Sequence, residues 1–404
     1  MKYINKKLTI EKVSVQNISK KYGTPAYCYS YSQLKENINK FKESFKSFSP
    51  LICFAIKSNT NVNLIREIKK FGLGADVVSV GELMIALKAG INPKKIVFSG
   101  VGKTSNEISY AIDKKILLIN AESKSEIIEI NRIAKLKKKK VQIGIRLNPN
   151  TDAKTLSQIS TGKKENKFGI NIKTFIDLIS YCRNSNNIEL KCLSVHIGSQ
   201  ILDFKPYERM LNTIKKVIKK TNHKFEFIDL GGGMGISYDN KYKKLDYKRY
   251  NIAIKKFLKN HQTKIIFEPG RSIVGSTGTL VSKIIYIKKN DKKNFIILDA
   301  AMNDLMRPAL YGAVHKTIPS VKTNKILNKI HEFVGPICET TDKFITLKKF
   351  QLLKEKDLIA ICDVGAYGMS LSSNYNLRPK PIELFIKGSK IRVIRKRQKH
   401  KDLM

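Results

Sequence analysis

The sequence predicts an α/β plus β protein: a (β/α)8 barrel of the TIM type and a second, mainly β domain with Greek-key-like topology. Three observations support this prediction. Between residues 51 and 267, eight apolar runs alternate with segments of helical periodicity. From residue 273 onward, short apolar runs and turns replace the helical segments. The length of 404 residues is too great for one small core and favours two domains.

The barrel is predicted element by element. A short strand is expected at 24–31 and a helix at about 32–45. The eight apolar runs follow at 51–56, 75–80, 95–98, 116–119, 141–147, 190–197, 225–230 and 264–267. Eight parallel-type strands with helices between them are typical of a (β/α)8 barrel. No helical segment follows the eighth run, so the helix at 32–45 is expected to take its place in the outer ring.

The second domain is predicted from the runs that follow the barrel. These runs fall at 280–287, 295–298, 326–333, 358–361 and 382–394. Because few helical segments lie between them, we expect a mainly β domain, completed by the N-terminal strand. The predicted domains are residues 1–30, a strand that joins the β domain, residues 31–272, the barrel, and residues 273–404, the β domain proper.

The net charge of +44 would by itself suggest nucleic acid or an anionic membrane as a partner. The lysines, however, are spread along the whole chain. The two densest clusters, 135–140 and 392–401, contain no Phe, Tyr or Trp that could stack on bases. A solvated surface is therefore favoured, and neither a specific nucleic acid nor a membrane is expected as a partner.

The cysteines indicate a reducing compartment. All six are scattered and form no C-x-x-C motif, which argues against a disulfide framework or a metal site; they are Cys28, Cys53, Cys182, Cys192, Cys338 and Cys362. The N-terminal residues lack the apolar core of a signal peptide. No run reaches the roughly 18 apolar residues that a membrane helix needs. We expect a cytoplasmic protein without a metal.

The chemistry centres on Lys57, which follows the first predicted barrel strand in the segment Phe-Ala-Ile-Lys-Ser-Asn. The C-terminal ends of barrel strands are where active sites are built. Desolvation and cationic neighbours lower the pKa of a lysine, and its free amine can then form an imine with a carbonyl. Taken alone, the segment equally fits a lysine whose ammonium lies in solvent.

Other strand ends carry polar or glycine-rich clusters. Asp76 lies in the second strand, and the sixth ends in His196-Ile197-Gly198-Ser199-Gln200. The seventh run is followed by Gly231, Gly232 and Gly233, whose backbone N–H groups can approach a phosphate closely. A glycine run also fits a simple tight turn. Its position on the seventh strand favours the phosphate, because the loops after strands seven and eight are this fold's common phosphate site.

The eighth strand ends in Glu268-Pro269-Gly270-Arg271. A carboxylate beside an aromatic nitrogen keeps that nitrogen protonated, and an arginine binds a phosphate or carboxylate bidentately. An ordinary Glu–Arg ion pair is the alternative for these two residues alone. Together with Lys57, His196 and the glycine run, these residues are what a protein needs to bind pyridoxal 5′-phosphate (PLP). The cofactor supplies the chemistry and the protein orients it.

The chain resembles the barrel family of PLP-dependent amino-acid decarboxylases from about residue 24 to residue 397. The family's lysine motif is matched at 54–59, with Phe54 and Ser58 where Tyr and Ala are common. The resemblance implies that Lys57 is the Schiff-base lysine and that Glu268 partners the pyridine nitrogen. The other cofactor-binding residues it implies are Asp76, Arg146, His196, Ser199, Gly231, Gly232, Gly233, Pro269, Gly270, Arg271 and Tyr367.

The resemblance also assigns substrate-binding residues, most of which lie in the second domain. Arg271, Arg307 and Tyr311 would bind substrate carboxylates, as would be needed for a substrate with two of them. The segment 335–340, Gly-Pro-Ile-Cys-Glu-Thr, matches a Cys-Glu-Ser motif in which Thr replaces Ser. It implies Cys338 as a proton donor and Glu339 as the partner of the distal ammonium, with Tyr367 contacting cofactor and substrate. Without the resemblance, Cys338 would be interpreted as a buried thiol and Tyr367 as a core aromatic.

The implied activity is PLP-dependent removal of CO2 from meso-2,6-diaminopimelate to give L-lysine, the last step of lysine biosynthesis. Because Cys338 and Glu339 are expected to reach in from the other subunit, a homodimer with a shared site is expected. Carboxynorspermidine or ornithine remains an alternative substrate. A non-catalytic, basic binding protein is a further alternative, against which the intact Lys57, His196, Glu268 and Cys338 argue.

Overall fold

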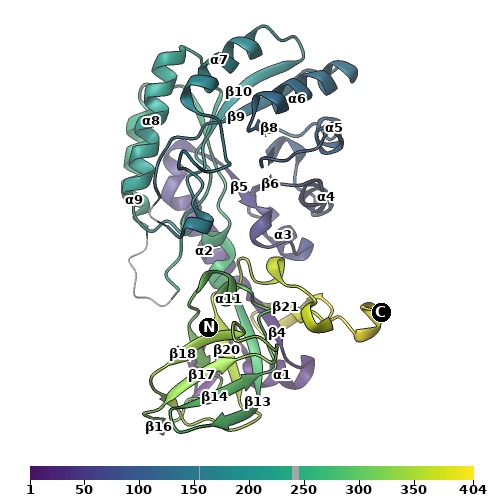
Figure 1. The fold of residues 1–404 in the computed structure, drawn as a ribbon, viewed down its shortest axis with the longest axis vertical. Coiled ribbons are helices and arrows are strands. Elements are labelled where there is room, and N and C mark those ends of the chain that lie inside the picture. The colour runs from purple at the N-terminus through teal and green to yellow at the C-terminus, as the bar shows by residue number, and fades with distance from the viewer. Residues whose placement is uncertain (154, 239–244) are drawn as a thin grey trace. The chain divides into compact units, whose positions relative to one another are not determined.

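The computed structural model describes residues 1–153, 155–238 and 245–404, and these form two compact units (Figure 1). The barrel unit comprises Ile38–Ile236 and the described part of Lys243–Ser272. The β unit comprises Met1–Asn37, the described part of Ser237–Tyr242, and Ile273–Met404. Each unit has a hydrophobic core of its own.

Eight parallel strands close the barrel in sequence order, and the eighth pairs with the first. They are β5 (Leu51–Ala55), β6 (Gly74–Val77), β7 (Ile96–Phe98), β8 (Leu118–Ala121), β9 (Val141–Arg146), β10 (Ile188–Ser194), β11 (Phe227–Asp229) and β12 (Lys264–Phe267). The helices that follow the first seven strands in this unit are α3 (Val62–Lys69), α4 (Val80–Lys88), α5 (Ser105–Asp113), α6 (Lys124–Leu136), α7 (Ile172–Arg183), α8 (Lys205–Thr221) and α9 (Tyr247–Leu258). Figure 1 shows α3 to α6 following one another outside the strands. The predicted barrel is confirmed.

The strand ends differ from the predicted runs where a helix cap intervenes. The run predicted at 75–80 ends at Val77, because Ser79 is already the N-cap of α4 and accepts the backbone N–H of Glu82. The first run ends one residue early, since Ile56–Ser58 form a 3-10 turn that carries Lys57. Apolar runs alone cannot mark these ends, because a capped turn can be as apolar as a strand.

The interior of the barrel is layered. One layer is apolar and consists of Cys53, Val97, Leu118, Cys192, Phe227 and Ile266. Side chains alternate between the two faces of a strand, so the residue two places further along points into the barrel as well. On five of the six strands those residues are polar and form a layer at the C-terminal end, and on the sixth strand, β5, the residue is Ala55; the polar residues are Ser99, Asn120, Ser194, Asp229 and Glu268. On these five strands, the inward-facing side chains therefore change from apolar to polar over a distance of two residues.

The missing helix of the outer ring is replaced from the N-terminal side, as the sequence predicted. After β12 only a four-residue helix follows, α10 (Arg271–Val274). The helix α2 (Tyr31–Phe45) instead packs Phe41 and Phe45 onto Phe267 of β12, with ring centroids 5.6 and 4.7 Å apart. Apolar aromatic packing of this kind anchors α2 against the eighth strand.

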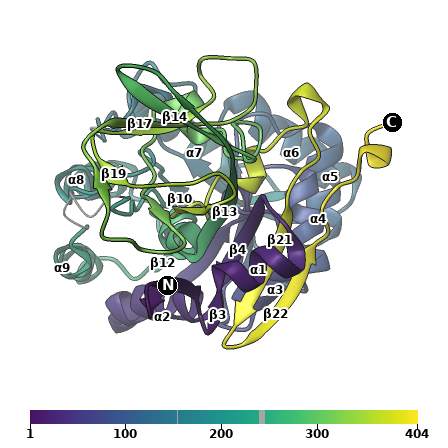
Figure 2. The same cartoon turned by 90° about the horizontal axis from the view of Figure 1, so that it is seen from below.

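The β unit is built on a mixed sheet in the order β18-β17-β14-β13-β4-β21-β22, with β20 pairing both β13 and β15. Its strands are β4 (Ala26–Ser30), β13 (Gly278–Lys289), β14 (Lys293–Leu298), β15 (Thr317–Pro319), β17 (Ile330–Val334), β18 (Lys343–Leu347), β20 (Leu358–Cys362), β21 (Ile382–Lys387) and β22 (Lys390–Arg395). The N-terminal β4 pairs antiparallel with β13 and parallel with β21. Figure 2 shows β4 beside β21. A mainly β domain that includes the N-terminal strand is thus confirmed.

Several smaller elements have no counterpart in the predicted runs. They are β1 (Lys2–Ile4), β2 (Lys7–Ile10), β3 (Val13–Ser14), α1 (Val15–Tyr22), α11 (Arg307–Tyr311), β15, β18 and β19 (Phe350–Gln351). The run at 326–333 is divided between β16 (Ile326–Leu327) and β17, and the run at 382–394 is a hairpin. Gly388 makes the hairpin turn with a φ of +58°, a conformation that favours glycine.

Candidate active site

Lys57 lies at the C-terminal end of β5 and is paired with a buried carboxylate. Its Nζ is 2.9 Å from Oδ2 of Asp76, which the neighbouring strand β6 supplies. The Lys57 side chain is 35% exposed, whereas Asp76 is fully buried. Among the described residues, none hydrogen-bonds the other oxygen of Asp76, Oδ1. The pair thus holds an ammonium at the C-terminal end of the barrel and leaves Oδ1 of Asp76 able to accept a further hydrogen bond.

Glu268 follows β12 and is almost completely buried, with 5% exposure. The hydroxyl of Ser99 donates to its Oε1 at 3.3 Å. Burial raises the pKa of Glu268 well above its ordinary value, and the negative charges of Asp229 and Asp76 raise it further against the opposing effect of Lys57. A carboxyl group in this environment retains its proton to unusually high pH.

The glycine segment after β11 brings three strand ends together. A Cβ on Gly231 would lie 2.6 Å from Nδ1 of His196, and one on Gly232 would lie 2.1 Å from the carbonyl oxygen of Glu268. Gly231 and Gly233 have φ of +63° and +87°. Only glycine satisfies both the conformation and the space, so the backbone itself lines this part of the site.

The backbone N–H of Gly232 also donates to Nδ1 of His196 at 3.1 Å. Because Nδ1 accepts, it carries no proton. Burial lowers the pKa of His196 well below its ordinary value, and the charges of Arg146 and Lys57 lower it further. His196 is therefore a neutral imidazole whose orientation is fixed by the glycine segment.

Two arginines complete the barrel group. Arg146, at the end of β9, bonds Oε1 of Glu122 at 2.9 Å and the carbonyl oxygen of His196 at 3.3 Å. Arg271, which is 6% exposed, donates to Oγ of Ser199 at 3.0 Å. The structure thereby joins the ends of β9, β10 and β12. The sequence interpretation missed Glu122, although its position directly after β8 was a usable signal.

Pro269 and Gly270 connect the eighth strand to the lysine segment. The carbonyl oxygen of Pro269 accepts the backbone N–H of Ala55 at 3.2 Å. A Cβ on Gly270 would lie 2.9 Å from that of Ser58. These close approaches fix the backbone on both sides of Lys57, and they explain the small residues at 55, 58 and 270.

The predicted site residues of the β unit fall into separate groups. Arg307 begins α11, is 5% exposed, and places its Nη1 2.8 Å from Nε2 of His315. Its guanidinium carbon lies 4.6 Å from the ring centroid of Tyr238. Tyr311 ends the same helix. His315, which is buried and holds the guanidinium from the side, was not predicted from the sequence.

Cys338 and Glu339 form a second group with the segment 375–376. The hydroxyl of Tyr375 donates to Oε1 of Glu339, and Sγ of Cys338 lies 4.0 Å from Oδ1 of Asn376. Cys338 is an exposed free thiol, so its interpretation as a buried thiol is wrong. Tyr367 is partly buried and has a φ of +57°, a strained conformation for a non-glycine residue that is often found at functional sites.

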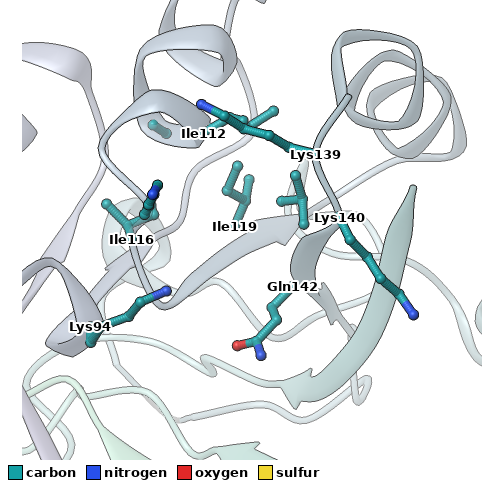
Figure 3. Close-up of a pocket in the computed structure, with 10 residues that line it drawn as sticks. Lys94, Ile112, Ile116, Ile119, Lys139, Lys140 and Gln142 are labelled. Atoms are coloured by element: carbon teal, nitrogen blue, oxygen red, sulfur yellow. The ribbon is translucent and has the colours of Figure 1, made fainter. Parts of the chain in front are cut away.

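A cavity of about 340 Å³ lies at the other, N-terminal end of the barrel strands. Ile112, Ile116 and Ile119 line it together with Lys94, Lys139 and Lys140, as Figure 3 shows. Nζ of Lys139 is 2.9 Å from a carboxylate oxygen of Asp113. The N-terminal end of a barrel serves stability and the C-terminal end chemistry. Lys94 and Lys140 are exposed at this end, and the interpretation of the cluster at 135–140 as a solvated surface stays a prediction.

Within residues 1–153, 155–238 and 245–404, no helix combines the length and the apolar character that crossing a membrane requires.

Comparison with known proteins places this barrel in a family. Residues 31–275 match the family described as pyridoxal-dependent decarboxylase, pyridoxal binding domain. The diaminopimelate decarboxylase of Aquifex aeolicus is 38% identical over 403 residues, which cover 99% of this chain and 95% of that protein. The diaminopimelate decarboxylase of Helicobacter pylori strain J99 is 43% identical over 389 residues, which cover 95% of each.

Solved structures agree with this placement. The H. pylori diaminopimelate decarboxylase complexed with L-lysine superposes with a TM-score of 0.92 at 41% identity, covering 96% of this chain and 98% of that one. The M. jannaschii diaminopimelate decarboxylase in co-complex with L-lysine gives a TM-score of 0.94 at 33% identity, covering 100% and 96%. A lysine/ornithine decarboxylase from Vibrio vulnificus, at 16% identity and a TM-score of 0.81, shares the fold.

The residues at the barrel end fit pyridoxal phosphate. The glycine segment leaves bare backbone where a Cβ would collide, as a phosphate cradle requires. The buried Glu268 carboxyl suits a ring nitrogen, and the spare oxygen of Asp76 lies beside the lysine that would hold the aldehyde. With the sequence, the fold and these residues in agreement, the chain belongs to the pyridoxal-dependent decarboxylase family and, within it, to the diaminopimelate decarboxylases.

Proposed function

We propose that this protein removes CO2 from meso-2,6-diaminopimelate to give L-lysine, with PLP as its cofactor. The observation that carries the proposal is the Lys57–Asp76 pair beside the buried carboxyl of Glu268 at the C-terminal end of a closed barrel. When bound, PLP supplies an electron sink for the electron pair that CO2 leaves behind. The protein is accordingly a carboxy-lyase, and a non-catalytic binding role is set aside.

In the proposed site, Lys57 holds the cofactor aldehyde and Glu268 faces the ring nitrogen. Asp76 positions the Lys57 ammonium from 2.9 Å and offers an acceptor for the proton that the amine must lose. His196, which is neutral and fixed by Gly232, is assigned to the ring face. The remaining cofactor contacts are assigned to Arg146, Ser199, Gly231, Gly232, Gly233, Pro269, Gly270, Arg271 and Tyr367.

Substrate recognition is assigned chiefly to the β unit. Arg307 with Arg271 and Tyr311 would bind the carboxylates, since a guanidinium matches a carboxylate in a planar, bidentate fashion. The bond between Arg307 and His315 fixes the orientation of that guanidinium. Glu339, whose Oε1 accepts from Tyr375, would bind the distal ammonium. The thiol of Cys338 would deliver its proton to the carbon that has lost CO2.

The substrate assignment is tested by CO2 release from the purified, PLP-loaded protein. We expect release from meso-diaminopimelate and little from ornithine, because ornithine has no second carboxylate that Arg307 could bind. Carboxynorspermidine is assayed alongside as the second rival. Turnover of either rival at a rate equal to that of diaminopimelate would contradict the assignment.

Glu339 provides a sharper test of substrate binding. We expect Glu339→Ala to raise the KM for diaminopimelate about 10- to 100-fold, the scale set by losing a hydrogen bond to a charged group. The affinity for PLP should stay unchanged. Asp291→Ala removes an exposed carboxylate from the same unit and serves as the control. A Glu339→Ala protein with a normal KM would rule out the proposed ammonium contact.

We further propose that the protein works as a homodimer in the cytoplasm. A shared site is supported by the exposure of Cys338 and Glu339, which are available to a second subunit. The cytoplasm is supported by the six free cysteines, which suit a reducing compartment.

A further inference from the structure

Asp229 ends β11 in the polar layer of the barrel and has no role in the function proposed above. Its side chain is fully buried. Oδ1 accepts the backbone N–H of Gly231 at 2.9 Å, and Oδ2 accepts Nδ2 of Asn120 at 3.1 Å and Oγ of Ser194 at 3.3 Å. Three donors directed at one carboxyl group stabilise its ionised form. The surroundings of Asp229 are therefore built for a negative charge.

The carboxyl groups of Asp229 and Glu268 are both buried, and Asn120 and Ser99 link them by hydrogen bonds. Two buried carboxyl groups that act on each other electrostatically are costly to ionise together, so the pair retains a proton. Since three donors already face Asp229, the shared proton belongs on Glu268. In this link, Asn120 donates to Asp229 at 3.1 Å and to Oγ of Ser99 at 3.3 Å, and Ser99 donates to Glu268.

We propose that Asp229 is a positioning residue for the cofactor: its fixed charge keeps the shared proton on Glu268, which therefore meets the ring nitrogen as an acid. The proton then passes to that nitrogen. The O–H bond of Glu268 breaks, an N–H bond forms, and Glu268 becomes the carboxylate that accepts the new N–H. No further reactant is needed. The inference rests on the proposed role of Glu268 in cofactor binding.

The electrostatics of the pair support this assignment. Burial raises the pKa of both carboxyl groups, and the charge of Asp229 raises that of Glu268 further. At Asp229, the interaction with Glu268 and the hydrogen bonds from Gly231 and Asn120 work against burial and lower its pKa. The order of ionisation is thus Asp229 first. The other ionisable groups that act on the pair or are acted on by it are Cys53, Lys57, Asp76, Cys192 and Tyr250.

The test is an infrared titration of the full-length protein without cofactor. A protonated carboxyl group absorbs at a higher frequency than a carboxylate, so the spectrum of wild type minus that of Glu268→Gln reports the proton on Glu268. In Asp229→Asn, referenced to the double variant, the midpoint of this titration should fall by roughly 1–3 pH units, the size of shift that one adjacent charge produces. An unchanged midpoint would mean that burial alone holds the proton and would overturn the proposal.

Two further measurements make the result specific. Adding PLP to the wild type should abolish the Glu268 band, and a band that persists would contradict proton donation. Glu82→Gln removes a different, partly buried acid, whose pKa burial raises to about 7, and should leave the Glu268 midpoint in place. A shift equal to that of Asp229→Asn would indicate a general disturbance and count against Asp229.

If Asp229→Asn does not fold, Ser194→Ala is the substitute. This variant removes one of the hydrogen-bond donors to Asp229. Because the Asp229 carboxylate is then less stabilised, the pH at which the pair takes up its second proton should rise. An unchanged pH would overturn the assignment of the negative charge to Asp229. These titrations need no turnover. Full activity in Glu268→Gln would instead refute the proposed role of Glu268 in catalysis. The titration result for the Asp229–Glu268 pair would still stand.

Discussion

Lys57→Ala is expected to abolish turnover. The variant lacks the only amine that the proposal assigns to the cofactor aldehyde, and removing a covalent nucleophile costs on the order of 10⁴-fold or more in kcat. CO2 release from diaminopimelate measures the loss. Borohydride treatment supplies an independent measurement, because it should attach the cofactor covalently to the wild type and leave Lys57→Ala unmodified.

The matched control is Lys256→Ala, which removes an exposed lysine on α9. It should retain wild-type activity and the borohydride adduct. The buried Asp76 would keep an uncompensated charge in Lys57→Ala, so a modest loss of stability is expected there. Near-normal turnover by a folded Lys57→Ala protein would disprove the proposed mechanism.

Cys338→Ala should show the second-largest loss, about 10²- to 10⁴-fold in kcat, the range that general acid catalysis contributes. PLP affinity and the KM for diaminopimelate should change little, because the thiol is assigned to a proton transfer. Cys182→Ala removes a thiol from α7 of the barrel unit and should leave kcat close to wild type. A Cys338→Ala protein with wild-type kcat would exclude the thiol as the donor.

Mixing the two inactive variants tests the shared site. If Lys57 and Cys338 serve one site from different subunits, random exchange in a twofold dimer restores about one quarter of the sites. If both residues come from one chain, mixing restores no activity. The experiment thereby separates a dimeric active site from one that is complete in each protomer.

The barrel could be predicted because its signal is repeated eight times. Each apolar run is followed by a polar or glycine-rich end, and errors of a residue or two, such as the end of β6 at Val77, leave the topology unchanged. The β unit was less predictable. Its sheet joins β4 to strands more than 200 residues away along the chain, and no local pattern encodes such pairings.

Within the candidate site, the residues found from the sequence alone were those that stand at strand ends. Lys57, His196 and Glu268 interrupt or follow apolar runs, so their position is visible without a structure. His315 and Tyr375 could not be found this way, because they act by holding Arg307 and Glu339 across loops. Asp229 was visible as part of a strand end, but its link to Glu268 through Asn120 and Ser99 exists only in the closed barrel.

The two layers inside the barrel have a consequence for how such a protein can evolve. On the five strands that supply both, an apolar residue and a polar residue stand two positions apart, roughly 6.6 Å along the strand. Drift in the first set, such as an exchange among Val97, Leu118 and Ile266, trades one packing for another. Substitutions in the polar layer change which of its side chains hold a proton. Mutations in the apolar layer can therefore adapt the stability of this barrel to a new growth temperature. Selection on the reaction meanwhile conserves the polar layer.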